Sequence, residues 1–261
     1  MEKSEIKLQK QTRKQGVFIT GTDTNVGKTW VGVRLAQKLQ HDYGLNVIPR
    51  KPVESGWSDE KLEQTDAWLL ASAADKQEYI NQVCPYRFKA PVSPERAAQN
   101  EGVTLSLDAI RQCCEIKLGK NDFILVEGAG GFYSPLCADA LNADLMLALG
   151  LPLLLVAEDR LGCINQVLLN IEAIKNTKLK LCAVVLNRKK DQGMDAAHKT
   201  THHKTIHHKT THHRTMANAL DLESRIDVPL VTINSSFSDS SNDKAFAELC
   251  RLLRDAMGAT I

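Results

Sequence analysis

VFITGTDTNVGKT (residues 17–29) is the stretch that decides the fold class. Its first four residues, VFIT, predict a short buried strand, and a glycine-bearing turn follows that ends in Gly27-Lys28-Thr29. A helix is expected next, near residues 28–41. Strand, turn and helix in this order are typical of a phosphate-binding P-loop, whose backbone N–H groups and helix N-terminus face the phosphates. Lys28 would add positive charge there, and the Thr29 hydroxyl is a ligand that Mg²⁺ accepts.

The spacing of this loop departs from the common pattern. Five residues separate Gly21 from Gly27, with Thr22 where the first glycine would stand, whereas the usual motif has about four. The alternative is a structural glycine turn. Such a turn would need neither a lysine nor a hydroxyl beside it, so we favour a nucleotide site.

Short apolar runs alternate with helix-length amphipathic segments along the rest of the chain. We predict strands at residues 17–20, 45–53, 122–128, 151–158, 179–187 and 228–233. Helices are expected near residues 28–41, 59–74, 105–118, 140–149, 164–176, 215–225 and 242–257. Several strand runs are continuously apolar, which is typical of parallel strands buried on both faces. The pattern predicts an α/β fold of the P-loop NTPase type, with a doubly wound, mostly parallel sheet flanked by helices.

The composition is that of an ordinary globular protein, with 43% hydrophobic and 25% charged residues. The 33 basic and 31 acidic residues give a net charge of only +2, which indicates neither nucleic acid nor a membrane surface as a partner. The seven cysteines form no C-x-x-C pair, so reduced thiols and a cytoplasmic location are expected. We expect residues 1–16 to be a polar tail, and residues 17–261 to form one domain.

Polar residues follow two other predicted strands. Lys51 and Ser55 lie in RKPVESGW (residues 50–57), where a lysine is either a solvated edge residue or a second cation beside a transferring group. Glu127 ends a buried run and precedes Gly128. A carboxylate there is costly unless it is paired or binds a metal, so Glu127 is a candidate Mg²⁺ ligand.

Two more positions allow an ordinary explanation. Asp66 lies early in a predicted helix, where favourable placement against the helix dipole is an ordinary explanation for a carboxylate. Residues 162–165, in EDRLGCINQ (158–166), would expose N–H groups at a helix start. These suit a carboxylate or phosphate, but equally an ordinary cap, and the residues do not decide between the two.

Six short motifs in a fixed order resemble the dethiobiotin synthetases. They are GTDTNVGKT (21–29), KPVESG (51–56), TDA (65–67), APVSPERAA (90–98), VEGAGGFYSPL (126–136) and RLGCINQ (160–166). The likeness covers about residues 17–190. It implies a homodimer with two sites at its interface, using ATP, Mg²⁺, CO₂ or bicarbonate, and 7,8-diaminononanoate. In that reaction an amine takes up CO₂ as a carbamate, ATP converts the carbamate to a carbamic–phosphoric anhydride, and the second amine closes the ring.

The resemblance also implies roles for individual residues. Lys28, Lys51 and Thr24 would be catalytic. Nucleotide contacts are implied for Asp23, Asn25, Val26, Gly27, Lys28, Thr29, Trp30 and Asn187. Substrate contacts are implied for Thr24, Lys51, Ser55, Gly128, Ala129, Gly130, Gly162, Cys163 and Asn165, the last three across the dimer interface. Mg²⁺ would be held by Thr29, Asp66 and Glu127.

Other members of the P-loop class are alternatives. A switch ATPase of the ParA/MinD kind usually carries an extra lysine early in the loop, where this chain has Thr22-Asp23-Thr24. An amide-forming ligase of the cobyrinic acid synthase type usually adds a glutaminase domain, for which the chain leaves no room. The chain also departs from many dethiobiotin synthetases, with Asn25 in place of Glu and with Glu95-Arg96 where a histidine is common.

A histidine-rich tract, THHKTIHHKTTHHRT (residues 201–215), lies between the last two predicted strands. Together with His198, which lies just before it, the tract holds seven of the eight histidines of the chain, at a repeat of five residues over 198–215. That repeat matches neither helix nor strand. Paired imidazoles can bind Zn²⁺, Cu²⁺ or Ni²⁺, but we favour an insertion that catalysis does not need, so deletion of residues 198–214 should leave turnover mostly intact.

Overall fold

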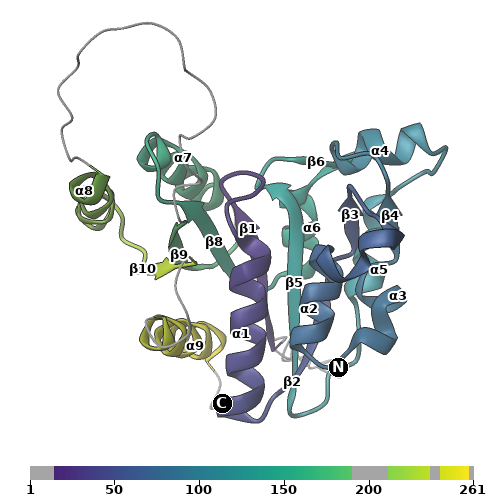
Figure 1. The fold of residues 1–261 in the computed structure, drawn as a ribbon, viewed down its shortest axis with the longest axis horizontal. Coiled ribbons are helices and arrows are strands. Elements are labelled where there is room, and N and C mark those ends of the chain that lie inside the picture. The colour runs from purple at the N-terminus through teal and green to yellow at the C-terminus, as the bar shows by residue number, and fades with distance from the viewer. Residues whose placement is uncertain (1–14, 190–210, 236–241, 259–261) are drawn as a thin grey trace, which may run out of the picture.

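The central sheet contains six strands, and every neighbouring pair is parallel. The computed structural model describes residues 15–189, 211–235 and 242–258. Within them the strand order is β10-β9-β8-β1-β5-β2 (Figure 1). The strands are β1 (Gly16–Gly21), β2 (Asn46–Arg50), β5 (Asp122–Gly131), β8 (Leu153–Glu158), β9 (Leu181–Arg188) and β10 (Leu230–Asn234). The predicted parallel α/β fold is confirmed.

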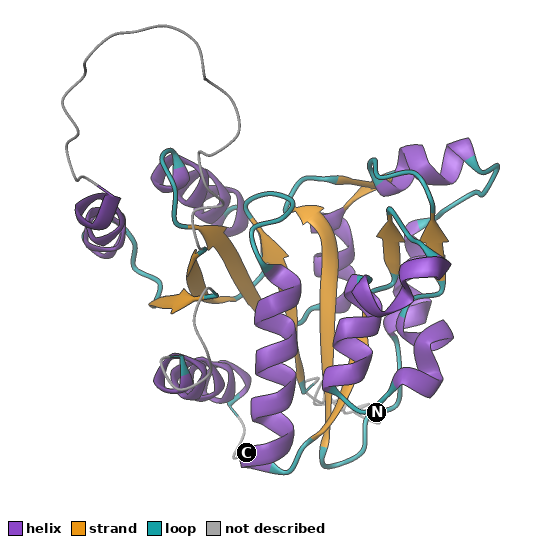
Figure 2. Cartoon of the chain, in the orientation of Figure 1, coloured by secondary structure: helices purple, strands orange, loops and turns teal. Residues whose placement is uncertain are grey.

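Helices cover both faces of this sheet (Figure 2). Val17 and Ile19 of β1 pack in one core with α1 (Lys28–Tyr43), α2 (Asp66–Ala73) and α9 (Asp243–Met257). Phe18 points to the other face, which is covered by α5 (Leu107–Cys114), α6 (Asn142–Leu149), α7 (Cys163–Lys175) and α8 (Thr211–Glu223). Successive side chains of a strand enter opposite cores, so the residues that point to either face must be apolar. This explains the continuous apolar runs in the sequence.

The predicted strand at 45–53 is wrong in extent, because the chain leaves the central sheet after Arg50. Pro52 has no N–H to donate to a ladder. Lys51 donates its N–H to Val83 O at 2.8 Å instead. The chain then enters β3 (Val53–Ser55), which pairs in parallel with β4 (Tyr86–Phe88) in a separate small sheet.

The predicted helix at 59–74 is also divided. It consists of η1 (Asp59–Gln64) and α2, separated by Thr65 in an extended conformation. The Thr65 hydroxyl accepts from the N–H of Trp68 and so caps α2. Elements that were not predicted are β4, η2 (Gln77–Tyr79), α3 (Ile80–Val83), α4 (Pro94–Asn100) and β6 (Pro135–Cys137). The helix predicted at 140–149 begins only at Asn142, because Ala140–Leu141 form β7.

Strand order fixes where the loops gather. The chain moves from β1 outward to β2, returns to β5 beside β1, and then crosses to β8 on the other side. The carboxyl end of β1 is therefore the switch point, where α/β sheets bind ligands. In the described part of the chain, no helix is long and apolar enough to cross a membrane. The polar tail, up to residue 14, and residues 198–210 of the histidine-rich tract lie outside the described residues, and α8 begins at Thr211, earlier than expected.

Candidate active site

The P-loop joins β1 to α1 through two residues with positive φ. Asn25 has φ 56° and Gly27 has φ 102°. A Cβ on Gly27 would lie 2.2 Å from the amide nitrogen of Asn187, so glycine is required here for space as well as for conformation. Within the described chain, no side chain caps α1 and no acidic residue lies in its first turn. The N–H groups at this helix start can therefore meet an anion.

Lys28 lies at the start of α1 and is only 6% exposed. Its ammonium group donates to the Asp23 carbonyl at 2.9 Å. Burial, reinforced by the nearby charge of Lys51, lowers the pKa of Lys28 to about 8. An anionic ligand would offset both effects, so the loop is suited to bind phosphate.

Four side chains from α1, α2, β5 and the end of β2 meet beside the P-loop. The Thr29 hydroxyl donates to Glu127 Oε1 at 2.9 Å. The Lys51 ammonium lies 2.5 Å from the same oxygen and 3.0 Å from Asp66 Oδ2. The other Glu127 oxygen, Oε2, is buried and has no hydrogen-bond partner among the described residues. An unsatisfied buried carboxylate oxygen is costly, and oxygen ligands suit Mg²⁺, so Thr29, Asp66 and Glu127 fit a divalent cation.

Opposite charges stabilise this cluster. Burial opposes the charge on Lys51, but the carboxylates of Glu127, Asp66 and Glu54 outweigh it and raise the pKa of Lys51. Burial also acts against the charge on Asp66, and Lys51 overcomes it, so the pKa of Asp66 is lowered. For Glu127, which is fully buried, burial prevails over the attraction of Lys51 and its pKa is raised. Lys51 thus stays protonated and holds both carboxylates in place.

A pocket of about 890 Å³ opens over these residues. The predicted site residues among those that line it are Thr24, Asn25, Gly27, Lys28, Thr29, Trp30, Lys51, Ser55, Asp66, Glu127, Ala129 and Gly130. Four polar residues that line the pocket had no predicted role: Glu54, Ser93, Ser134 and Lys189. Glu54 has a signal in the sequence, a carboxylate between Val53 and Ser55 at the end of an apolar run.

The glycine-rich end of β5 is held from outside the strand. Gly130 has φ 79°, and the Ser134 hydroxyl accepts from the N–H of Gly131 at 2.8 Å. The buried amide of Asn142 donates to the carbonyls of Ala129 and Gly131. These contacts fix the backbone that forms one side of the pocket.

Other predicted site residues do not line the pocket described here. Asp23 accepts from the N–H of Thr24 at 2.7 Å, and Gly128 is packed against the Phe18 ring. The Asn187 amide donates to the carbonyl of Val26 at 3.0 Å, so this hydrogen bond connects the P-loop to β9. At the start of α7, Gly162 has φ 90° and is exposed, Cys163 is buried and Asn165 is exposed. In a single chain these last three lie apart from the pocket, and their role across a dimer interface stays a prediction.

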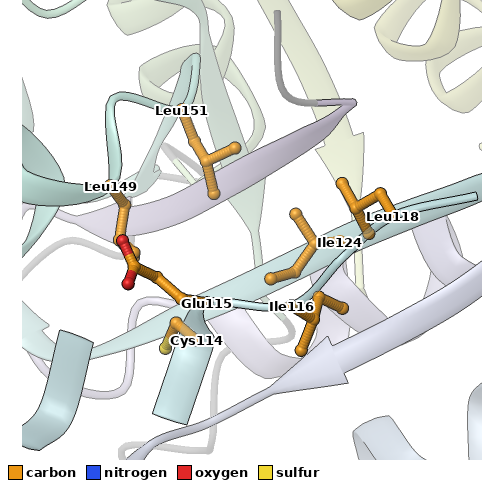
Figure 3. Close-up of a pocket in the computed structure, with 7 residues that line it drawn as sticks. All are labelled: Cys114, Glu115, Ile116, Leu118, Ile124, Leu149 and Leu151. Atoms are coloured by element: carbon orange, nitrogen blue, oxygen red, sulfur yellow. The ribbon is translucent and has the colours of Figure 1, made fainter. Parts of the chain in front are cut away.

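A second pocket, of about 280 Å³, includes no residue of the P-loop, and Figure 3 shows the seven side chains that line it. It is lined by Cys114, Glu115, Ile116, Leu118, Ile124, Leu149 and Leu151. Glu115 carries the charge among these residues, and it pairs with Arg111 at 2.5 Å. Binding sites combine apolar walls with converging polar groups. The cleft beside the P-loop has both, so it is the candidate active site.

Comparison with known proteins agrees with the motifs. A family model described as an AAA domain matches residues 15–231. The ATP-dependent dethiobiotin synthetase BioD of Vesicomyosocius okutanii is 42% identical over 176 residues, which are 67% of this chain and 79% of that protein. The protein of the same name from Caulobacter vibrioides is 38% identical over 179 residues, 68% of this chain and 81% of that protein.

Among solved structures, a ParA family ATPase from Chlorobium tepidum matches 94% of both chains with a TM-score of 0.48 and 13% identity. The relatives named above are much more similar in sequence, and the match to each covers most of its length. From these sequence matches we conclude that the chain belongs to the ATP-dependent dethiobiotin synthetase family.

Proposed function

We propose that this chain closes the ureido ring of dethiobiotin from 7,8-diaminononanoate and CO₂ at the expense of ATP. Family membership supports the reaction. The observation that carries the proposal is the convergence of Lys28, Lys51 and three candidate cation ligands in one pocket of about 890 Å³. A carbamate oxygen attacks the γ-phosphorus and ADP leaves. The second amine then attacks the carbamoyl carbon, phosphate leaves, and the amine loses a proton.

The charges of the pocket suit this chemistry. Carbamate and ATP are both anionic, so bringing them together requires positive charge that is already in place. Lys28 supplies it at the P-loop, and Lys51 at the end of β2 holds Glu127 and Asp66 where they would bind Mg²⁺. Mg²⁺, held by Thr29, Asp66 and Glu127, would neutralise phosphate charge when bound. The protein mainly positions reactants, because the chemistry asks for little covalent participation.

Two features of the pocket support binding of the diamine. The Ser55 hydroxyl is buried with no hydrogen-bond partner in the described chain, so it can bond to a polar group of the substrate. Thr24 lies on the same pocket. Apolar lining comes from Val53, Leu69, Pro91 and Val92, which suits the methylene chain of a nonanoate.

The proposal includes a homodimer in the cytoplasm. Residues 162–165 stand outside the pocket of their own chain, and the neighbouring Leu161 is 91% exposed. A second copy would cover this leucine and bring the α7 start to the partner's pocket. All seven cysteines are free thiols, in keeping with a reducing compartment. Sedimentation at micromolar concentration should give twice the chain mass.

The direct test is a reaction of the purified protein with ATP, Mg²⁺, bicarbonate and 7,8-diaminononanoate. We expect ADP release that depends on both the diamine and bicarbonate, with dethiobiotin identified by mass spectrometry. A switch ATPase would behave differently. ADP release that ignores the diamine and rises with DNA or a protein partner would contradict the proposal.

A further inference from the structure

Glu54 holds the beginning of α2 from a different strand. The residue lies on β3 and is 7% exposed. Its Oε1 accepts from the N–H of Asp66 at 2.8 Å, and its Oε2 accepts from the N–H of Ala67 at 2.9 Å. Both carboxylate oxygens are therefore bonded to the first two N–H groups of the helix.

This arrangement is additional to the ordinary cap of α2. Thr65 already provides that cap, because its hydroxyl accepts from the N–H of Trp68 at 3.3 Å. Burying a carboxylate is costly, and burial does raise the pKa of Glu54. Because both carboxylate oxygens accept a hydrogen bond, this charge-assisted contact fixes the orientation of the helix start relative to Glu54 as well as its distance from it. The two hydrogen bonds that Glu54 of β3 accepts from α2 thus fix where the first turn of α2 lies relative to the pocket.

The first residue of that turn is Asp66, whose carboxylate meets Lys51 at 3.0 Å. An aspartate side chain has two rotatable bonds, so the place of its carboxylate follows closely from the place of its backbone. Moving the backbone by a fraction of a hydrogen-bond length would move Asp66 away from Thr29, Lys51 and Glu127. The position of one candidate cation ligand therefore depends on Glu54.

We propose that Glu54 is a positioning residue: its carboxylate holds the N-terminus of α2 so that Asp66 lies at the cation site beside Lys51 and Glu127. The inference rests on the proposed function, in which Asp66 helps to hold Mg²⁺. Glu54 acts through backbone N–H groups and does not itself contact the reacting atoms.

The test measures cation binding without the diamine. Mn²⁺ serves as the probe, and free Mn²⁺ is followed by electron paramagnetic resonance during titration of the protein with ADP present. Glu54→Ala should raise the Kd of Mn²⁺ about tenfold, equivalent to about 1.4 kcal/mol. ADP affinity in EDTA should stay at the wild-type value, because Lys28 and the P-loop backbone are untouched.

Thr65→Ala is the matched control, since it removes a cap from the same helix but leaves the Glu54 contacts in place. It should bind Mn²⁺ as the wild type does. Glu54→Gln keeps one acceptor oxygen and should raise the Kd about threefold, so it decides the question if Glu54→Ala fails to fold.

Three results would overturn the inference. One is wild-type Mn²⁺ affinity in both Glu54 variants. Another is an equal loss of ADP affinity in EDTA, which indicates general damage to the fold. The third is a Thr65→Ala variant as weak as Glu54→Ala. Wild-type protein that binds ADP but no Mn²⁺ would instead refute the cation site of the proposed function, and the positioning role with it.

Discussion

Replacing Lys51 by methionine should destabilise the protein strongly when no divalent cation is present. The Lys51 side chain is 5% exposed, and it is paired with Glu127, which is 0% exposed. Methionine keeps the length of the side chain but removes the cation, so the buried carboxylate loses its closest opposite charge. Breaking a buried ion pair in this way costs about 3–5 kcal/mol of the free energy of unfolding. Turnover should fall by on the order of a thousandfold or more, comparable to removing about 4 kcal/mol of transition-state stabilisation.

Lys38→Met is the matched control for this experiment. Lys38 also meets two carboxylates, Asp42 at 2.6 Å and Asp243 at 2.9 Å, but their side chains are 47% and 69% exposed. Solvent screens such pairs, so the loss of unfolding free energy should stay below about 1 kcal/mol. The two substitutions therefore remove the same charged group, and they differ in how far its carboxylate partners are buried.

Urea unfolding in EDTA measures both variants, and ADP release with the full set of substrates measures turnover. Adding Mg²⁺ and ADP should restore part of the stability lost in Lys51→Met, because a cation on Glu127 replaces the missing charge. The reasoning fails if Lys51→Met loses no more stability in EDTA than Lys38→Met. Near-normal turnover in the Lys51 variant would remove this residue from the site.

Three further predictions concern the scaffold. Gly27→Ala should weaken ADP binding by on the order of tenfold or more, because the new Cβ would lie 2.2 Å from the Asn187 amide nitrogen. The positive φ of this residue would add a cost of about 1–2 kcal/mol. Calorimetry measures the affinity, and an unchanged value would contradict the prediction. Asn142→Ala leaves the carbonyls of Ala129 and Gly131 without this donor and should cost about 1–3 kcal/mol in urea unfolding, so a loss below about 0.5 kcal/mol would refute it. Burial raises the pKa of four thiols to about 11 or 12, namely Cys84, Cys137, Cys182 and Cys250. The unfolded chain therefore releases these protons first, and stability should fall as pH rises above about 9. Thermal melts between pH 8 and 10.5 measure this, and a flat profile would contradict it.

Much of the fold could be predicted because its strands are buried on both faces. Apolar residues follow one another without a break at 123–126 and 151–157, and β5 and β8 lie there. The errors occur where a single residue interrupts a pattern. The chain leaves the central sheet after Arg50, just before Pro52, and Thr65 separates the polar segment DEKLEQ of η1 from the apolar helix DAWLLASA of α2. In both cases the local signal was present but was read as part of the longer run.

The site was predictable in a similarly uneven way. Glu127 and Lys51 could be found, because a charged residue at the end of a buried run needs a partner. Asp66 was ambiguous, since the helix dipole explains an acidic residue in a first turn without any ligand. The role of Glu54 depends on the chain leaving the central sheet before β3, so that Glu54 meets a helix start 12 residues later. That meeting is a product of tertiary packing, and no spacing rule in the sequence encodes it.

Lys28 and Lys51 differ in how their charge is balanced, and this difference indicates what each of them does. Lys28 donates to the carbonyl of Asp23, so its charge is not cancelled by that contact and can attract an anion at the P-loop. Lys51 lies between the carboxylates of Glu127 and Asp66, so its charge is largely balanced within the protein. Phosphate recognition is therefore expected mainly from Lys28. Lys51 keeps the buried carboxylate of Glu127 and the partly exposed carboxylate of Asp66 together, where two unpaired charges would repel each other. The same contact that stabilises the fold thus preserves the geometry on which a cation site depends.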